Sequence, residues 1–153
     1  MMEADNNLAM IYSEVLKEVV FTITSISLEV LSEKKGSGFS EMVGVMSLNG
    51  QKRNGVLFIT APEAHIRLLC SYMVGVPEAK LSNEDVEDAL CELVNIVAGT
   101  AKLRLSTTDY SFNLSAPFVV RGDNMAVGVK NKTRLISREL GNDDINVGIK
   151  VFY

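Results

Sequence analysis

The sequence predicts an α+β fold, with long helices packed on one face of a largely antiparallel β-sheet. Two long segments, residues 5–24 and 83–105, repeat apolar side chains every three or four positions, which is typical of amphipathic helices. Most other segments are short, rich in β-branched and aromatic residues, and bounded by turn residues, as antiparallel strands are. The expected order along the chain is α-β-β-β-α-α, followed by a β meander.

The N-terminal half contains one long helix and then a group of strands. Asp5 or Asn6 can cap this first helix, because short polar side chains favour that position. Strands are expected at residues 27–33, 41–48 and 55–60. The turn residues of 34–38 close the first strand, and Asn49-Gly50 indicates a hairpin after the second. Because the polar stretch continues to Asn54-Gly55, the extent of that hairpin loop stays open.

The second half is expected to hold two helices and a run of strands. Pro62 suits the first turn of a helix at residues 62–73, and Gly75 suits its end. Ser82, with Asp85 three positions later, has the spacing of a capping box and predicts the start of the long central helix. The remaining strands are expected at residues 110–114, 117–121, 125–129, 133–139 and 146–152.

Length and composition indicate a single cytoplasmic domain that spans residues 1–153. The net charge of −4 and the lack of a long basic cluster argue against a nucleic-acid partner. The longest apolar runs are shorter than the ~18 residues that a membrane span requires. The acidic start has no positively charged segment of a signal peptide, and Cys70 and Cys91 are expected to be reduced thiols in apolar helical surroundings.

Most familiar catalytic patterns do not occur in this sequence. His65 is the only histidine and has no acidic or nucleophilic residue placed around it as a catalytic partner, so we expect an ordinary helical residue. Cys91 has no cationic neighbour in sequence that would favour a reactive thiolate. Gly36-Ser-Gly38 precedes a strand, whereas a phosphate-binding loop precedes a helix. The spacings of known metal-ligand motifs are also missing.

One face of the central helix departs from the composition of an ordinary solvated face. At ~100° per residue, five residues fall within ~80° of one another: Asp88, Glu92, Asn95, Gly99 and Lys102. The opposite side is apolar and carries Leu90, Leu93, Val94, Val97 and Ala101. Asn and Gly in mid-helix cost roughly 0.7 and 1 kcal/mol relative to Ala. The face is therefore either a solvated surface that tolerates these costs or a docking surface for a protein partner, with Glu92 and Asn95 as its polar tips.

The spacing of these residues resembles the signature of the CheX/CheC/FliY chemotaxis phosphatases. Asp88, Glu92 and Asn95 are followed by Gly99 four positions on, and 21 residues separate Asn95 from Pro117. Two-motif members of the family carry a second copy on the N-terminal helix, where this chain reads Glu14-Val-Leu-Lys17. The chain therefore resembles the single-motif CheX more than CheC, and a CheC/CheX-like fold is expected. Residues 21–38 match the family poorly.

The resemblance implies an aspartyl-phosphate phosphatase that acts on a CheY-type receiver domain, in chemotaxis or a related two-component pathway. By similarity, Asn95 orients the attacking water and Glu92 pairs with a lysine of the receiver. Gly99 allows close approach, Asp88 contacts the partner or stabilises the first helical turns, and Pro117 shapes the loop beneath the motif. Mg²⁺ is expected from the phosphorylated receiver, so this chain needs no cofactor of its own.

Three further expectations accompany this interpretation. The resemblance implies a homodimer joined through the sheet, and edge strands in the C-terminal half need pairing or cover. A non-catalytic adaptor, either receiver-binding or similar to a flagellar-switch domain, is the alternative function, because the same fold could serve it without Glu92 and Asn95 together. A generic α+β domain with an accidental motif is the third interpretation. The sequence does not identify the cognate receiver or the strand at the dimer edge.

Overall fold

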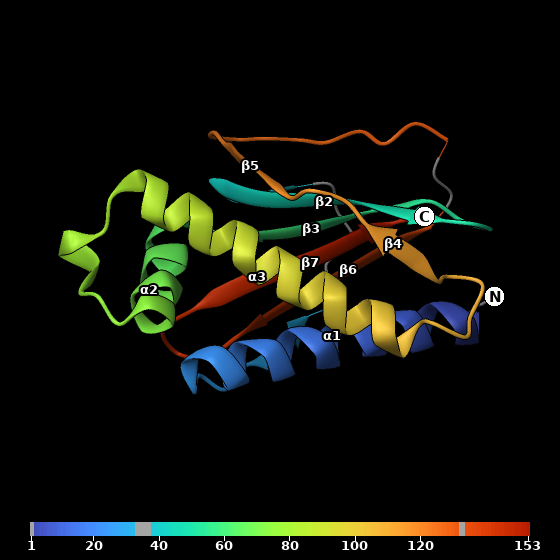
Figure 1. Ribbon diagram of the computed structural model, residues 1–153, viewed down its shortest axis with the longest axis horizontal. Helices are drawn as coiled ribbons and strands as arrows, with labels where there is room; N and C mark the ends of the chain where they lie inside the picture. Colours follow the sequence, from blue (N-terminus) through green and yellow to red (C-terminus); the bar gives the residue numbers. More distant parts are fainter. Residues whose placement is uncertain (1, 33–37, 132–133) are drawn as a thin grey trace.

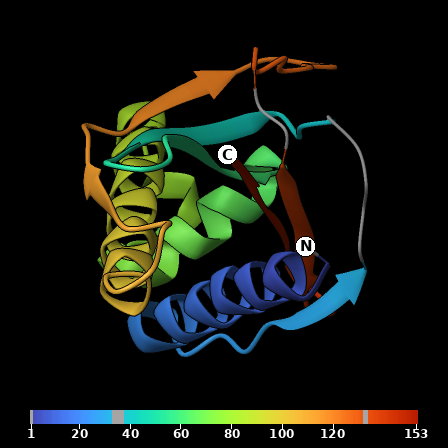
Figure 2. The same ribbon diagram turned by 90° about the vertical axis from the view of Figure 1, so that its right-hand side faces the viewer.

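The computed structural model describes residues 2–32, 38–131 and 134–153. In this part of the chain, helices cover one face of a seven-stranded sheet whose pairings are all antiparallel (Figure 1). Figure 2 shows the sheet curving around the helices, with α1 and α3 inside the curve. The predicted fold class is therefore confirmed.

The helices lie where the periodicity predicted them, with small differences at their ends. Their bounds are α1 Met2–Thr24, α2 Glu63–Val74, the 3₁₀ helix η1 Glu78–Lys80, and α3 Asn83–Arg104. Pro62 is the N-cap of α2 rather than part of its first turn. Gly75 ends α2 with a φ of 69°, a left-handed conformation that costs glycine little.

The strands follow the predicted order but not the predicted meander. Their bounds are β1 Glu29–Ser32, β2 Met42–Gly50, β3 Gly55–Ala61, β4 Phe112–Leu114, β5 Phe118–Arg121, β6 Leu135–Gly141 and β7 Asn146–Phe152. The order across the sheet is β1-β6-β7-β3-β2-β4, and β5 also pairs with β2. Nine-residue β2 pairs with β5 along residues 42–45 and with β4 along 48–50, so one long strand accommodates both short ones. The β6–β7 hairpin then enters on the other side, between β1 and β3.

The strand predicted at residues 125–129 is wrong. Apart from an isolated bridge between Gly38 and Ala126, the described residues give this segment no strand pairing. Its alternation has another cause, because Met125, Val127 and Val129 pack against buried Val43, Val45 and Phe58. A period of two thus reflects an extended segment packed against a sheet rather than a strand within it.

The other boundaries shift by a few residues. The hairpin loop left open by the sequence spans residues 51–54, and α1 ends at Thr24 as predicted but begins at Met2 rather than at residue 5. β1, β4 and β6 each begin two residues later than predicted. Residues 33–37 and 132–133, which include much of the predicted 34–38 turn and Gly36, lie outside the described residues.

The core lies between the helices and the sheet, and close contacts at two places fix the long helices. A Cβ atom at Gly44 in β2 would lie 2.5 Å from Val94 and 3.0 Å from Leu90, so only glycine lets α3 approach β2 this closely. In α1, the buried Tyr12 hydroxyl hydrogen-bonds the Tyr153 hydroxyl across 2.5 Å. Burial of Tyr153 raises its pKa to about 12. These contacts fix which face of each helix remains exposed.

Candidate functional site

Helix α3 begins with a capping box. The Ser82 hydroxyl accepts a hydrogen bond from the Asp85 N–H at 3.0 Å, and the Asp85 carboxylate accepts one from the Ser82 N–H at 2.8 Å. The Ser82 backbone bond and then its side-chain bond lower the pKa of Asp85. The predicted capping box is therefore confirmed. The opposite end carries Lys102 and Arg104, whose positive charges interact favourably with the C-terminal end of the helix dipole.

The helix separates its apolar and polar residues as predicted. Its buried residues are Val86, Ala89, Leu90, Leu93, Val94, Val97, Ala98 and Ala101. Asp88, Glu92 and Asn95 are exposed on the other side, and Gly99 is half-buried. Because residues three apart on a helix have neighbouring side chains, about 5–6 Å between Cβ atoms, Glu92 and Asn95 are presented together.

The side chains of Glu92 and Asn95 are not engaged by the part of the chain that the structure describes. Among the residues that the structure describes, neither side chain has a hydrogen-bond or ion-pair partner. A Cβ atom at Gly99 would meet no heavy atom within 4 Å, so packing inside the domain does not require glycine there. Lys102, further along the same face, contacts the Asn113 side-chain oxygen at 3.4 Å. Glu92 and Asn95 can therefore meet a partner without first losing contacts to the described part of the chain.

Pro117 lies between two strands that run beside this helix. It is half-buried, directly before β5, and both β4 and β5 pack against α3. Ser115 in the same link donates a hydrogen bond to the Ser47 carbonyl in β2 at 2.8 Å, which holds the link to the sheet. The role of Pro117 in shaping this loop stays a prediction.

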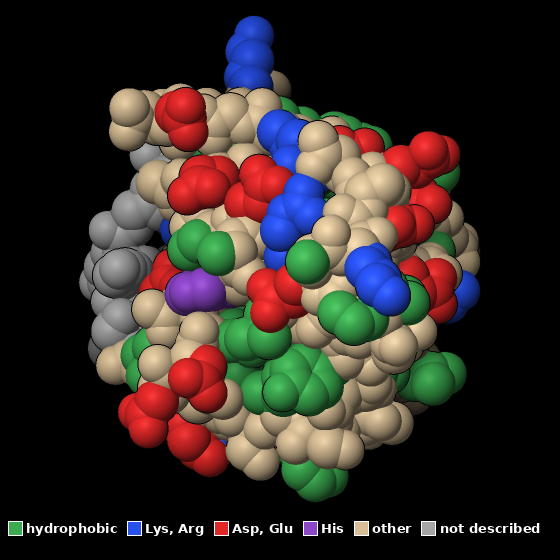
Figure 3. Space-filling view, turned by 90° about the vertical axis from the view of Figure 1, so that its left-hand side faces the viewer, with side chains coloured by type: hydrophobic (Ala, Val, Ile, Leu, Met, Phe, Trp, Pro, Cys, Tyr) green, Lys and Arg blue, Asp and Glu red, His purple; other side chains and the backbone are tan. Residues whose placement is uncertain are grey.

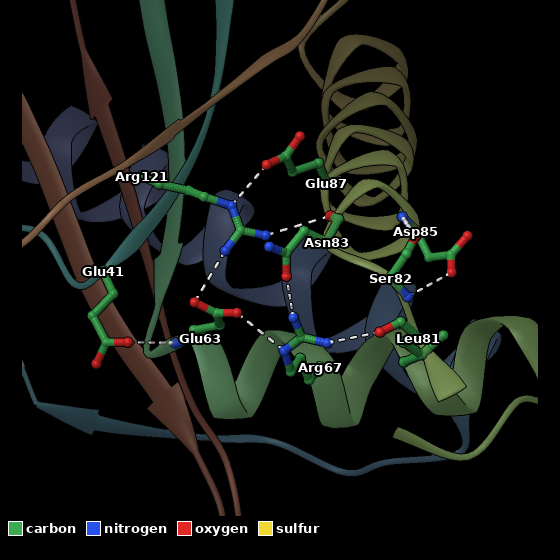
Figure 4. Close-up of polar contacts among 9 residues, drawn as sticks. All are labelled: Glu41, Glu63, Arg67, Leu81, Ser82, Asn83, Asp85, Glu87 and Arg121. Carbon is green, nitrogen blue, oxygen red and sulfur yellow. Dashed lines mark hydrogen bonds and ion pairs between the residues drawn. The ribbon is translucent and has the colours of Figure 1, made fainter. Parts of the chain in front are cut away.

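A polar network holds the start of α3 against α2 and β5 (Figure 4). Arg121, at the end of β5, lies between Glu87 of α3 at 2.7 Å and Glu63 of α2 at 3.0 Å. It also donates to the Asn83 carbonyl at 3.4 Å. Burial raises the pKa of Glu63, but the bonds and charges of Arg121 and Arg67 outweigh it and hold that pKa below its ordinary value.

Arg67 connects the same helices from the α2 side. Its guanidinium contacts Glu63 at 3.0 Å, the Leu81 carbonyl at 3.2 Å and the Asn83 side chain. Sequence reasoning missed this network, and only the i,i+4 spacing of Glu63 and Arg67 signalled any part of it. Since Glu87 directly precedes Asp88, the network fixes the part of α3 from which the exposed face extends.

The surroundings of His65 and Cys91 indicate structural rather than catalytic roles. His65 Nδ1 accepts a hydrogen bond from the Asn146 N–H at 3.0 Å, which joins α2 to the start of β7. Cys91 is half-buried, and burial, then the charges of Asp88 and Glu87, raise the pKa of its thiol. A raised thiol pKa opposes a nucleophilic role. Within the described residues, no three His, Cys, Asp or Glu side chains converge as a metal site.

The sequence model described as "Chemotaxis phosphatase CheX" matches residues 42–138, more than half of the chain. The chain belongs to the CheX family. Its fold matches the chemotaxis protein CheX from Vibrio vulnificus with a TM-score of 0.84 and 23% identity, over 95% of this chain and 98% of that one. A CheC-like superfamily protein from Shewanella sp. PV-4 gives 0.82 and 26%, over 95% and 96%. No curated protein matches the chain.

A third similar structure is a complex, that of CheX with CheY, BeF₃ and Mg²⁺ from Borrelia burgdorferi. Its TM-score is 0.74 at 14% identity, over 94% of this chain and 95% of that one, which establishes a common fold. The CheC/CheX-like fold expected from the sequence is thus confirmed. As for the membrane, no helix in the described ranges combines the length and apolar character needed to cross one.

On α1, the segment Glu14-Val-Leu-Lys17 has Lys where the Glu-x-x-Asn spacing of α3 has Asn. The Lys17 ammonium lies 3.3 Å from the Glu29 carboxylate of β1. Lys17 of α1 therefore takes part in an ion pair within the chain.

Proposed function

We propose that this chain hydrolyses the aspartyl phosphate of a CheY-type receiver domain, in chemotaxis or a related two-component pathway. The observation that carries the proposal is the exposed pair of Glu92 and Asn95, which have no partner among the described residues and lie on a helix whose other face is buried. Membership of the CheX family supports it. The complex of the Borrelia CheX with CheY supports the choice of a receiver as substrate.

The chemistry requires positioning rather than a protein nucleophile. Water attacks phosphorus in line, the bond between phosphorus and the aspartate oxygen breaks, and the receiver regains its carboxylate as inorganic phosphate leaves. In the proposed complex the Asn95 carboxamide both accepts from and donates to this water, which fixes the direction of attack. The receiver's own Mg²⁺ and lysine neutralise charge on the phosphoryl group.

Glu92 is proposed to set the register of the complex. Its carboxylate pairs with the receiver lysine, three residues from Asn95 on the same rigid helix, so one contact positions the other. Fixing a water and a phosphoryl group in this way can contribute several kcal/mol to the barrier reduction. Gly99 leaves room for the receiver backbone, and Asp88 adds a contact one turn before Glu92.

The test is phosphate release from a phosphorylated receiver. Each CheY-type receiver of the source organism is phosphorylated with a small-molecule phosphodonor, and inorganic phosphate is followed with and without this chain. We expect acceleration with at least one receiver. If the chain binds a beryllofluoride-activated receiver but accelerates phosphate loss from none, the adaptor function replaces the phosphatase.

We also propose a homodimer joined through the sheet at the β4–β5 end. Within the described residues, β5 pairs only with β2, so its outer edge is open, and Phe118 is 52% exposed beside an apolar hollow of about 320 Å³. An open apolar edge favours pairing with a second copy. Sedimentation at tens of micromolar is expected to give a dimer and Phe118→Asp a monomer. A wild-type monomer at that concentration would contradict the proposal.

The free thiols of Cys70 and Cys91 are typical of the cytoplasm, where we place the protein.

A further inference from the structure

A groove lies between α2 and α3, directly beside the exposed motif. Its volume is about 540 Å³, enough for one or two large side chains. One wall is apolar and consists of Met73 and Val74 at the end of α2 and Val76 just after it. The other wall is acidic and consists of Asp85, Asp88 and Glu92 on α3.

The three carboxylates form a row along the helix. Residues 85, 88 and 92 fall within about 60° of one another at 100° per residue, so they project along one side of the groove. Among the described residues, none of the three has an ion-pair partner, and no Lys or Arg side chain lines the groove. Asp85 accepts the Ser82 N–H of the capping box, whereas Asp88 and Glu92 have no side-chain partner among the described residues, so these two carboxylates are available to a ligand.

Asp85, Asp88 and Glu92 are exposed, so the acidic wall of the groove faces solvent. Figure 3, which views the α2 end of the molecule, shows hydrophobic side chains gathered on that end with charged side chains around them. Val74 is half exposed at the end of α2. An apolar wall that faces a row of carboxylates without ion-pair partners favours a ligand that is apolar on one side and cationic on the other.

The groove is continuous with the proposed catalytic pair, because Glu92 belongs to both. At 1.5 Å per residue, residue 85 lies about 10 Å along the helix from residue 92, and residue 88 about 6 Å. An ordinary interface buries about 800 Å² on each partner, which corresponds to a patch with a radius of roughly 16 Å. A receiver that brings its phosphoryl group to Asn95 therefore also covers the groove.

We infer that the groove binds a basic, amphipathic segment of the phosphorylated receiver and determines which receiver this chain accepts. An apolar side chain of that segment packs against Met73, Val74 and Val76, and an adjacent Lys or Arg lies beside Asp85 and Asp88. This inference rests on the proposed function, since the occupant is the substrate protein itself. The groove contributes to binding, and Asn95 remains the group that acts in the transition state.

The test compares substitutions in the groove wall with a matched change elsewhere. Val74→Lys places a charge against the apolar wall at an exposed position, and Met10→Lys makes the same kind of change at an exposed position of α1. With a receiver phosphorylated by acetyl phosphate, Val74→Lys is expected to raise KM about 10-fold with kcat unchanged, as loss of one well-packed contact would. Val74→Ser, which adds no charge, is expected to raise KM about 3-fold. Met10→Lys should match the wild type.

The acidic wall is tested through salt. Asp88→Asn is expected to raise KM at low ionic strength, and the difference from wild type should shrink at about 0.5 M salt, where exposed charges are screened. The effect of Val74→Ser should persist there, because it is not electrostatic.

The outcomes separate this inference from the proposed function. If the wild type hydrolyses the phosphorylated receiver and Val74→Lys behaves like Met10→Lys, the groove has no role and the phosphatase assignment stands. If the wild type binds a beryllofluoride-activated receiver but does not hydrolyse the phosphorylated one, the phosphatase proposal is overturned. The Kd values of the same variants for the activated receiver then test the role of the groove. If the wild type neither binds nor hydrolyses any receiver, both are overturned.

Discussion

The two long helices of this protein have similar lengths, but polar side chains of α1 contact other elements whereas those in the middle of α3 face outward. Helix α1 has 23 residues and α3 has 22, and they pack against each other over the sheet. On α1, Lys17 pairs with Glu29 of β1, and Glu18 pairs with Arg104 at the end of α3. In the middle of α3, Glu92 and Asn95 have no partner among the described residues.

This difference teaches that helical periodicity alone does not distinguish a structural polar face from a docking face. Both helices place polar residues opposite an apolar side, as amphipathic helices do. Lys17 and Glu18 of α1 contact neighbouring elements of the fold, so their loss should affect stability. Glu92 and Asn95 of α3 have no side-chain partner among the described residues, so their loss should affect the binding of a partner. The predictions below test that division.

The largest effect is expected from Asn95→Ala on α3. Loss of the carboxamide removes the orientation of water, an interaction used in the transition state, so kcat should fall by on the order of 100-fold, about 2.7 kcal/mol. Because Ala is the better helix former at an exposed position, the melting temperature should hold or rise slightly. The measurements are phosphate release at saturating receiver and a thermal melt. Lys17→Ala on α1 is the matched control. Equal losses of kcat in the two variants would contradict the proposed difference between α1 and α3.

Glu92→Ala should affect binding at least as much as turnover. The proposed pair with the receiver lysine exists before chemistry, so KM should rise about 10-fold and the salt dependence of KM should weaken. Initial rates over a range of receiver concentrations give KM and kcat separately. Glu14→Ala on α1 should leave both unchanged. A pure kcat loss for Glu92→Ala would place this carboxylate in the chemical step instead of the docking step.

The sequence predicted those features that depend on local chemistry. The capping box at Ser82, the glycine end of α2 and the division of α3 into buried and exposed faces all follow from neighbouring residues, and the structure confirms them. The resemblance to the CheX family, carried by Glu92 and Asn95, also depends on local spacing, and the match to the family model confirms that family.

Features that depend on distant residues were missed. β4 and β5 both pair with β2, and this pairing depends on the length of β2 and on its free edge, which lie far away in the sequence. The predicted meander was wrong for this reason. Arg121 meets Glu63 and Glu87 only in the folded chain. The groove between α2 and α3 arises from the packing of two helices, and no short pattern in the sequence encodes it.

A moderate effect is expected on the network that holds the start of α3. Arg121→Met should lower the free energy of unfolding by about 1 kcal/mol at neutral pH, because partly exposed ion pairs contribute little more. The pKa of Glu63 is depressed in the folded state, so its contribution is full above its ordinary value of 4.5 and is lost as pH falls through the folded value. The difference between wild type and Arg121→Met should therefore shrink in acid.

Urea unfolding at neutral pH and in acid measures that difference. Lys52→Met, which breaks the exposed pair with Asp109, serves as the control and should cost less at neutral pH. A gap between wild type and Arg121→Met that stays constant as pH falls would mean that Arg121 stabilises the fold through packing alone.

The smallest effect is expected where α1 is given the missing motif residue. Lys17→Asn converts Glu14-Val-Leu-Lys17 to the Glu-x-x-Asn spacing of α3, and it is made in the Asn95→Ala background. Glu14 and Lys17 border a hollow whose other lining includes Phe21 and residues 27–29, so a receiver has less free helix face here than on α3. We therefore expect no recovery of phosphate release, together with a small loss of stability because Glu29 loses its cation. Recovery of turnover would show that spacing alone makes the site, and that the surroundings of α3 are dispensable.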